Sequence, residues 1–283
     1  MLTSTSFKST FTLGADLTVN RLGYGAMRIT GKGIWGPPAN HDESIRVLKR
    51  AVELGVNFID TADSYGPNVS EELIAEALYP YAEGLVIGTK GGLTRTGPDQ
   101  WPVNASPEHL QQALEGSLKR LKLDTIDLYQ LHRVDTNVPV EKTFEFLQKA
   151  QQQGKIKHIG LSEVDVNTIK KAQEFFDVVS VQNMYSVDNR KWESVLDYCK
   201  EQNMAFIPWF PLNAANVAGQ EKLKSIAERH NATVYQLALS WLLHHSGNIL
   251  LIPGTSSVKH LEENMKSARL VLTNEDMDEL NNL

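Results

Sequence analysis

The feature that most constrains this chain is a regular alternation of short apolar runs with longer helical stretches. Eight runs rich in apolar and β-branched residues recur along the 283 residues. They cover residues 22–27, 57–62, 85–90, 126–132, 156–163, 178–185, 204–210 and 248–255. Strand–helix alternation builds parallel sheets, because parallel neighbours need a long crossover connection. Eight units without a dividing linker predict an α/β fold, the (β/α)8 or TIM barrel, with residues 1–283 forming a single domain.

The segments between the runs carry helix start and stop signals. In "HDESIRVLKRAVELG" (41–55) apolar residues share one face, and Gly55 ends the pattern. In "SPEHLQQALEGSLKRLK" (106–122) Ser106 is placed to cap the helix and Pro107 to occupy its first position. Both segments therefore predict amphipathic helices.

The two ends of the chain predict additions to the barrel. "FTLGADLTV" (11–19) predicts an N-terminal β-hairpin that plugs the amino-terminal end of the barrel. "TNEDMDELNNL" (273–283) predicts an extra C-terminal helix capped by Thr273. A doubly wound Rossmann sheet is the main alternative, but "RLGYGAM" has too few glycines for its G-x-G-x-x-G turn. The barrel is therefore favoured.

Charge and composition limit the partners. The net charge of −6 argues against nucleic acid or an anionic membrane as the main partner. The single cysteine, Cys199, excludes an intramolecular disulfide and fits a reducing compartment. The start of the chain lacks the apolar core of a signal peptide, and no apolar run reaches the roughly 18 residues of a membrane span. Neither H-E-x-x-H nor C-x-x-C spacing is present. We expect a cytoplasmic protein without a metal, as a monomer or small homo-oligomer.

The polar residues at the predicted strand ends are the candidates for chemistry, because barrel active sites lie at the carboxyl ends of the strands. Strand two ends at Asp60 and is followed by Tyr65, strand three ends at Lys90, and strand four ends at His132. Asp63, between Asp60 and Tyr65, is interpreted as ordinary loop polarity.

These four residue types suit the reduction of a carbonyl. A free phenol, with a pKa of about 10, is a weak proton donor at neutral pH. A neighbouring ammonium lowers that pKa, and a carboxylate keeps the ammonium charged and oriented. A neutral histidine can donate a hydrogen bond to the carbonyl oxygen. Together the four groups fit delivery of a proton to oxygen while a cofactor supplies the hydride.

Each residue alone also has a structural interpretation. Asp60 is placed to cap a helix, Tyr65 to pack in a loop, and His132 to fill a structural role. Lys90 at a barrel strand end is also typical of a Schiff-base aldolase or lyase. A third hypothesis is a catalytically weak redox sensor that binds nicotinamide cofactor and reports its state to a partner.

Six segments in order resemble the aldo-keto reductase superfamily. They are "NFIDTADSYG", "GTKGG", "LYQLHR", "GKIKHIGLSE", "VQNMYS" and "IPGTSSVKHLEEN". The resemblance covers essentially the whole chain, and it implies an NADPH-dependent reduction of an aldehyde or ketone. It also implies a catalytic tetrad of Asp60, Tyr65, Lys90 and His132, with Tyr65 as the general acid.

The resemblance further implies an NADP-type cofactor, and we expect NADPH in preference to NADH. Ser162 and Gln182 would hold the nicotinamide carboxamide, and Trp209 would stack on the ring. The chain departs from the family pattern at Glu163, usually Asn, and where relatives carry Lys and Arg in place of Gly254 and His260. The full set implied to bind the cofactor is Ser162, Gln182, Trp209, Pro211, Leu212, Gly254, Thr255, Ser256, Ser257, Lys259, His260, Glu263 and Asn264.

Two Gly/Pro-rich loops are expected to form the substrate walls. "TGKGIWGPPANH" (30–41) supplies Trp35, and "GGLTRTGPDQWPVNAS" (91–106) supplies Trp101. Two aromatic walls favour a flat or apolar small-molecule carbonyl. Within the family, "GIWGPP", "EALYPY" and "LLIPGTSSVKHLEENM" look most like bacterial pyridoxal-reductase-type members, which suggests an aromatic aldehyde such as pyridoxal.

Overall fold

The structure is a computed structural model that describes residues 7–211 and 221–283. Its strands are β1 (Thr10–Leu13), β2 (Leu17–Asn20), β3 (Tyr24–Gly25), β4 (Phe58–Asp60), β5 (Val86–Gly91), β6 (Ile126–Leu131), β7 (Ile156–Ser162), β8 (Val178–Gln182) and β9 (Ala205–Phe206). Its helices are η1 (Ala26–Ile29), α1 (His41–Glu53), α2 (Val69–Leu78), α3 (Pro107–Leu121), α4 (Val140–Gln152), α5 (Val166–Gln173), α6 (Glu193–Glu201), α8 (Glu221–Arg229), α9 (Val234–His245), α10 (Val258–Met265), η2 (Lys266–Arg269) and α11 (Asn274–Asn281).

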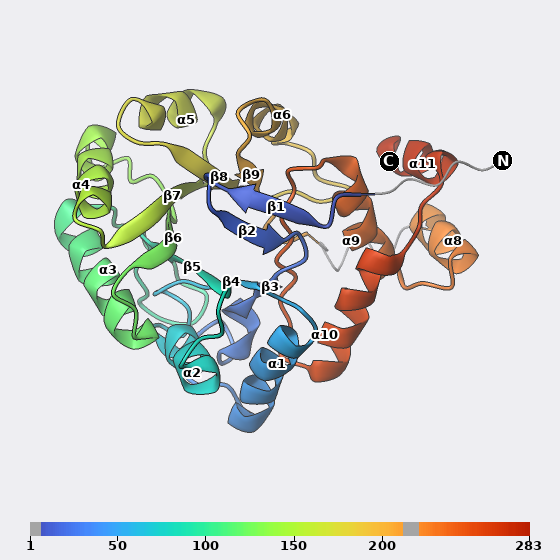
Figure 1. Ribbon diagram of the computed structural model, residues 1–283, viewed down its shortest axis with the longest axis horizontal. Coiled ribbons are helices and arrows are strands. Elements are labelled where there is room, and N and C mark those ends of the chain that lie inside the picture. The colour runs from blue at the N-terminus through green and yellow to red at the C-terminus, as the bar shows by residue number, and fades with distance from the viewer. Residues whose placement is uncertain (1–6, 212–220) are drawn as a thin grey trace.

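A parallel sheet in the order β3-β4-β5-β6-β7-β8-β9 curls into a barrel with the helices outside it (Figure 1). The eighth predicted strand, residues 248–255, closes the ring through single parallel bridges. Ile249 pairs with Phe206 of β9, and Leu251 pairs with Leu22 beside β3. The predicted (β/α)8 fold is therefore confirmed, with its last strand reduced to isolated pairings.

Local sequence signals explain where the outer helices begin. Ser106 Oγ accepts a hydrogen bond from His109 N (3.3 Å), with Pro107 in the first turn of α3, as predicted. After α1, Gly55 has a φ of +90°, which only glycine adopts without strain. Thr273 forms a capping box with Asp276 at the start of α11, which confirms the extra C-terminal helix.

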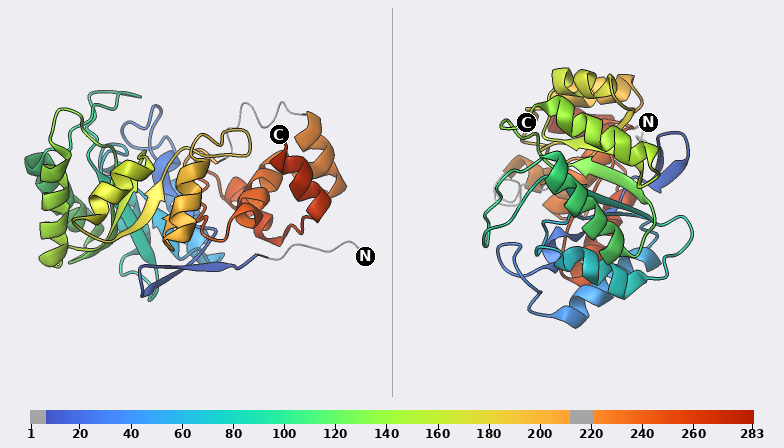
Figure 2. Two further views of the ribbon diagram at one scale, coloured as in Figure 1. Left: turned by 90° about the horizontal axis from the view of Figure 1, so that it is seen from above. Right: turned by 90° about the vertical axis from the view of Figure 1, so that its left-hand side faces the viewer.

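The predicted N-terminal hairpin is also confirmed. Strands β1 and β2 pair antiparallel, and Phe11, Leu13 and Val19 pack against the inward-facing apolar side chains of the barrel strands. The hairpin lies along the lower edge in the left view of Figure 2, opposite the long loops that follow β3 and β5. One end of the barrel is therefore filled with apolar side chains, and the other is available for polar ones.

The outer core packs between the sheet and the helices. Trp241 of α9 and Cys199 of α6 are both fully buried there, so Cys199 is a packed core residue. In the described ranges, 7–211 and 221–283, none of the helices is long and apolar enough to span a bilayer.

Candidate active site

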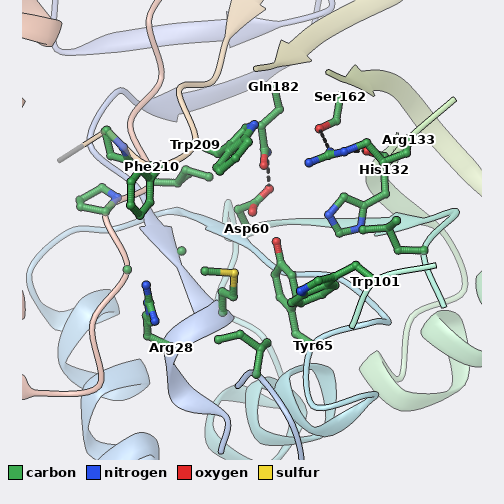
Figure 3. A pocket seen from close by; sticks show the side chains of 18 of the residues that line it. Arg28, Asp60, Tyr65, Trp101, His132, Arg133, Ser162, Gln182, Trp209 and Phe210 are labelled. Carbon is green, nitrogen blue, oxygen red and sulfur yellow. Dashed lines mark hydrogen bonds between the residues drawn. The ribbon is translucent and has the colours of Figure 1, made fainter. Parts of the chain in front are cut away.

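A cavity of about 720 Å³ opens at the carboxyl ends of the barrel strands (Figure 3). Many residues predicted from the sequence line it. They are Asp60, Tyr65, Trp101, His132, Ser162, Gln182, Trp209, Pro211 and Gly254. Strand pairing brings them together: Asp60 lies opposite Gly25 and Gly88, Lys90 opposite Gln130, and Ser162 opposite Gln182.

Lys90 and Asp60 form a buried ion pair beneath the cavity, with 2.6 Å between Nζ and Oδ2. Nζ also donates to Thr61 O (2.8 Å) and Tyr65 Oη (3.3 Å), so the three ammonium hydrogens all have acceptors. Burial acts to lower the pKa of Lys90, but Asp60 and Tyr65 outweigh burial and raise it above its ordinary value. A charged lysine without a free donor does not favour the Schiff-base alternative.

Asp60 is held on its other side by two glutamines that the strand register places beside it. Gln130 Nε2 donates to Asp60 Oδ1 at 3.0 Å, and Gln182 Nε2 donates to the same oxygen at 2.9 Å. Gln130 was not predicted from the sequence. The sequence did contain an indication of its position, because Gln130 lies two residues before His132 and every second side chain of a strand points to the same face.

The phenol of Tyr65 lines the cavity, with its hydroxyl pointing toward Asp60 (Figure 3). Burial raises the pKa of Tyr65 and outweighs the opposing effect of Lys90, so the net direction is upward. The prediction of a lowered Tyr65 pKa is wrong, because the desolvation of the phenolate outweighs the neighbouring charge.

His132 lies beside Tyr65, with the two ring centroids 5.9 Å apart. Its Nδ1 is 3.4 Å from Ser64 Oγ. Burial, followed by the charges of Lys90 and Arg133, holds the pKa of His132 well below its usual value. The ring is therefore neutral at physiological pH and can donate a hydrogen bond from one nitrogen only.

The residues expected at the nicotinamide end line the cavity but already have protein partners. Ser162 Oγ accepts from Arg133 Nη1 at 3.0 Å. The Gln182 amide nitrogen donates to Asp60 and to Gln130 Oε1 (3.1 Å). The Ser162 hydroxyl hydrogen and the Gln182 carbonyl oxygen remain for a ligand.

Glu163 has a role that the sequence did not indicate. Its Oε1 accepts from Trp209 Nε1 at 2.7 Å and from Met184 N at 2.6 Å. The backbone turns sharply there, since Glu163 has a φ of 55°. The carboxylate therefore fixes the aromatic ring at the cavity wall.

The far end of the cavity reaches Pro253 and Gly254, just before α10. The first turn of a helix normally presents free backbone N–H groups that can bind an anion. One of them is taken, because Val258 N donates to Glu43 Oε1 of α1 at 3.1 Å.

The other residues predicted for that end occupy varied positions. Thr255 Oγ1 accepts a hydrogen bond from Ser257 N. The exposed residues are Ser256, Lys259 and His260, whereas Glu263 is half-buried and Asn264 is buried. Leu212, also predicted to contact cofactor, lies outside the described residues.

The two loops expected to form the walls are held together by Arg95. Its guanidinium donates to carbonyl oxygens of both loops, among them Ile34 O (2.6 Å) and Gln100 O (2.9 Å). It also lies 3.6 Å from the centroid of the Trp101 ring. Trp101 lines the cavity as predicted, but Trp35 does not; its neighbour Ile34, with a φ of 53°, turns inward instead.

Two arginines in the cavity wall were missed by the sequence analysis. Arg133 directly follows His132, and Arg28 lies beside Gly254. The remaining lining residues that were not predicted are Gly25, Met27, Ile34, Leu93, Asp99, Val103, Phe210, Ile252 and Pro253. Within residues 7–211 and 221–283, no group of three or more His, Cys, Asp or Glu side chains could hold a metal ion.

Known proteins resemble this chain in sequence and in fold. Residues 21–283 match the aldo/keto reductase family. An uncharacterised oxidoreductase of Schizosaccharomyces pombe is 50% identical over 92% of this chain and 85% of its own length. Pyridoxine 4-dehydrogenase of Escherichia coli is 43% identical over 97% of this chain and 98% of its own. The crystal structure of an aldo-keto reductase from Klebsiella pneumoniae in complex with NADPH superposes with a TM-score of 0.84, at 25% identity, over 98% of this chain and 95% of that one.

Proposed function

The chain belongs to the aldo/keto reductase family, and we propose that it reduces an aldehyde or ketone to an alcohol with NADPH, using Tyr65 as the proton donor. The observation that carries the proposal is the position of the Tyr65 hydroxyl. It faces the cavity 3.3 Å from the ammonium of Lys90, which is itself paired with Asp60.

The side chains along the cavity fit a nicotinamide dinucleotide phosphate. Trp209 offers an aromatic face at one end, and the exposed cations Arg28 and Lys259 lie toward the other, where an adenosine phosphate would need them. The Ser162 hydroxyl and the Gln182 carbonyl oxygen would bind the nicotinamide carboxamide. When bound, the reduced cofactor supplies the hydride, and everything else in the reaction is done by the protein.

Tyr65 would give its proton to the carbonyl oxygen as negative charge develops there. The raised pKa keeps the phenol protonated through neutral pH, so Tyr65 carries the proton that it would donate. Lys90 would then stabilise the phenolate that is left behind, because its ammonium contacts the same oxygen. Asp60 keeps that ammonium in place.

His132 would orient the substrate. A neutral ring that accepts from Ser64 at Nδ1 carries its hydrogen on Nε2, where it can donate to the carbonyl oxygen. Since the pKa of His132 is depressed and that of Tyr65 is raised, neither group titrates near neutrality. The turnover number for reduction is therefore expected to stay flat from about pH 7 to about pH 9.

We propose an aromatic aldehyde such as pyridoxal as the substrate. The cavity wall carries Trp101 and Tyr65 at 6.3 Å between ring centroids, with Leu93 and Ile34 nearby, which suits a flat ring. Support also comes from the 43% identity with pyridoxine 4-dehydrogenase of E. coli, since pyridoxine and pyridoxal differ by the oxidation of one alcohol.

A panel of carbonyl compounds, assayed with NADPH and NADH in parallel at the nicotinamide absorbance, tests the proposal. Aromatic aldehydes, pyridoxal among them, should be reduced faster than aliphatic ones, and NADPH should be the better donor. Tight NADPH binding without turnover of any compound would overturn the proposal and favour the redox-sensor hypothesis.

A further inference from the structure

The side chain of Arg133 occupies an unusual place in the cavity wall. Its Nη1 donates to the carbonyl oxygen of His132 (2.6 Å) and to Ser162 Oγ (3.0 Å). These two bonds fix the guanidinium beside the tetrad histidine. Figure 3 shows its end extending from the side of His132 toward Trp209, and the centroid of that ring is 5.8 Å from Arg133 Cζ.

The remaining donors of this guanidinium are unused. Within residues 7–211 and 221–283, neither Nε nor Nη2 of Arg133 donates a hydrogen bond, and no carboxylate lies within 4.0 Å of it. Burial lowers the pKa of Arg133, and the charge of the Glu163 carboxylate opposes this lowering. Glu163 Oε1 already accepts from Trp209 and Met184.

Arg21 and Arg120, two other arginines with little exposure, have protein acceptors. Arg21 donates from all three nitrogens to backbone carbonyls, and Arg120 Nε donates to Glu71 at 2.7 Å. A half-buried guanidinium with free donors is costly unless something accepts them. Because the free donors of Arg133 face a cavity, the missing acceptor is expected on a ligand.

The position of the Arg133 guanidinium indicates which part of a ligand carries that acceptor. The reacting carbonyl would lie between Tyr65 and His132, whose rings are 5.9 Å apart. Arg133 lines the same cavity directly after His132, and its charge acts to lower the pKa of His132 and, against the larger effect of burial, that of Tyr65. An acceptor that reaches Arg133 must therefore lie within a few atoms of the reacting carbonyl.

We propose that Arg133 is a specificity-determining residue that binds an oxygen on the ring carbon next to the one bearing the reacting aldehyde. The substrate class is then the 2-hydroxyaryl aldehydes, whose neighbouring phenol or phenolate accepts a charge-assisted hydrogen bond from the guanidinium. This inference rests on the proposed function, since it concerns the same site.

Two positional isomers separate this role from general binding. With NADPH, wild-type protein should show a kcat/KM for 2-hydroxybenzaldehyde about 10- to 100-fold above that for 4-hydroxybenzaldehyde. Arg133→Met should bring this ratio close to one, because it should lower kcat/KM for 2-hydroxybenzaldehyde and leave kcat/KM for 4-hydroxybenzaldehyde unchanged. Arg133→Lys should restore part of the ratio, because it keeps the charge but not the planar fork.

Arg28→Met is the matched control, since it removes the other guanidinium of the cavity wall at its far end. Any weakening of NADPH binding by this variant should lower kcat/KM for both isomers by the same factor, so the isomer ratio should stay unchanged. The Kd for NADPH, followed by quenching of tryptophan fluorescence, should stay within about threefold of wild type in Arg133→Met.

Three results would overturn the inference. The first is a wild-type ratio near one, and the second is an equal loss for both isomers in Arg133→Met. The third is a loss that follows a proportional rise in the NADPH Kd, which would make Arg133 a cofactor-positioning residue.

Failure of the proposed function is distinguishable from these results. Were wild-type protein to reduce neither isomer, binding of the two aldehydes to the NADP⁺-loaded protein, where hydride transfer cannot occur, would still test Arg133. Preferential binding of the 2-isomer, lost in Arg133→Met, supports the inference there, and equal binding contradicts it.

Discussion

Two clusters of buried charged residues lie on opposite sides of the same part of the sheet. The inner cluster is Asp60, Lys90 and their glutamine partners, beneath the cavity. The outer cluster is Asp63, Glu71, Arg120, Thr89 and Tyr129, between the sheet and helices α2 and α3. Adjacent residues of β5 serve the two clusters, because successive side chains of a strand point to opposite faces.

The clusters differ in how completely their polar atoms are paired. Both carboxylate oxygens of Asp60 accept hydrogen bonds, and every hydrogen of Lys90 Nζ has an acceptor. In the outer cluster, Asp63 Oδ1 and Tyr129 Oη have no partner within the described ranges. Buried charge alone therefore does not identify an active site. The inner cluster is distinguished because it supports a phenol that faces a cavity.

The strongest way to break the inner cluster is Lys90→Met. It leaves Asp60 buried without a cation and Tyr65 without the ammonium that would stabilise its phenolate. We expect turnover to fall by at least about a hundredfold and the free energy of unfolding to fall by about 3 kcal/mol. Steady-state kinetics and urea unfolding of the same preparation measure both. Turnover near the wild-type level would show that the inner cluster is merely structural.

The outer cluster should respond in stability alone. Among the described residues, Arg120→Met leaves the fully buried carboxylate of Glu71 with only Thr89 as a side-chain donor, at 2.5 Å. We expect the free energy of unfolding to fall by about 3 kcal/mol while kcat of the folded protein stays within about threefold of wild type. Lys142→Met, which breaks an exposed pair with Glu145, is the control and should change neither. A large loss of kcat in Arg120→Met would erase the contrast between the clusters.

Asp63 predicts a pH dependence that belongs to the outer cluster. Burial, followed by the charge of Glu71, raises the pKa of Asp63 from 3.8 to about 8. The folded protein therefore holds a proton that the unfolded chain releases, and this contribution to stability is lost as pH rises from about 4 to about 8. Asp63→Asn should remove that loss and raise the melting temperature at pH 8 by about 3 °C or more. An unchanged melting temperature at pH 8 would mean that Asp63 is already ionised without cost.

The smallest effect is expected at Glu163, which holds Trp209 without touching the tetrad. Glu163→Ala should raise the Kd for NADPH about three- to tenfold, because the indole loses its anchor. Glu163→Gln keeps an acceptor oxygen and should stay within about twofold. Fluorescence titration distinguishes them. Equal weakening by both variants would mean that the charge, not the anchoring bond, matters.

The overall fold and the gathering of Asp60, Lys90 and His132 at one rim could be predicted because both depend on local patterns. Apolar runs give the strands, Ser106 and Thr273 mark helix starts, and the carboxyl ends of parallel strands bring Asp60, Lys90 and His132 to one rim. The hairpin followed from alternating residues around a turn.

What could not be predicted depends on contacts between distant segments. Glu43 reaches Val258, and Glu71 pairs with Arg120, only after the helices have packed. Asp63 was interpreted as loop polarity, yet it is buried, because the sequence does not show which loop side chains turn under the helices. The direction of the Tyr65 pKa depends on the degree of burial, which no residue pattern gives.

The most direct test of the whole account is Tyr65→Phe, which removes one hydroxyl and keeps the ring. We expect kcat for aldehyde reduction to fall by at least about a hundredfold while the Kd for NADPH stays within about threefold. Turnover comparable to wild type in this variant would contradict Tyr65 as the proton donor.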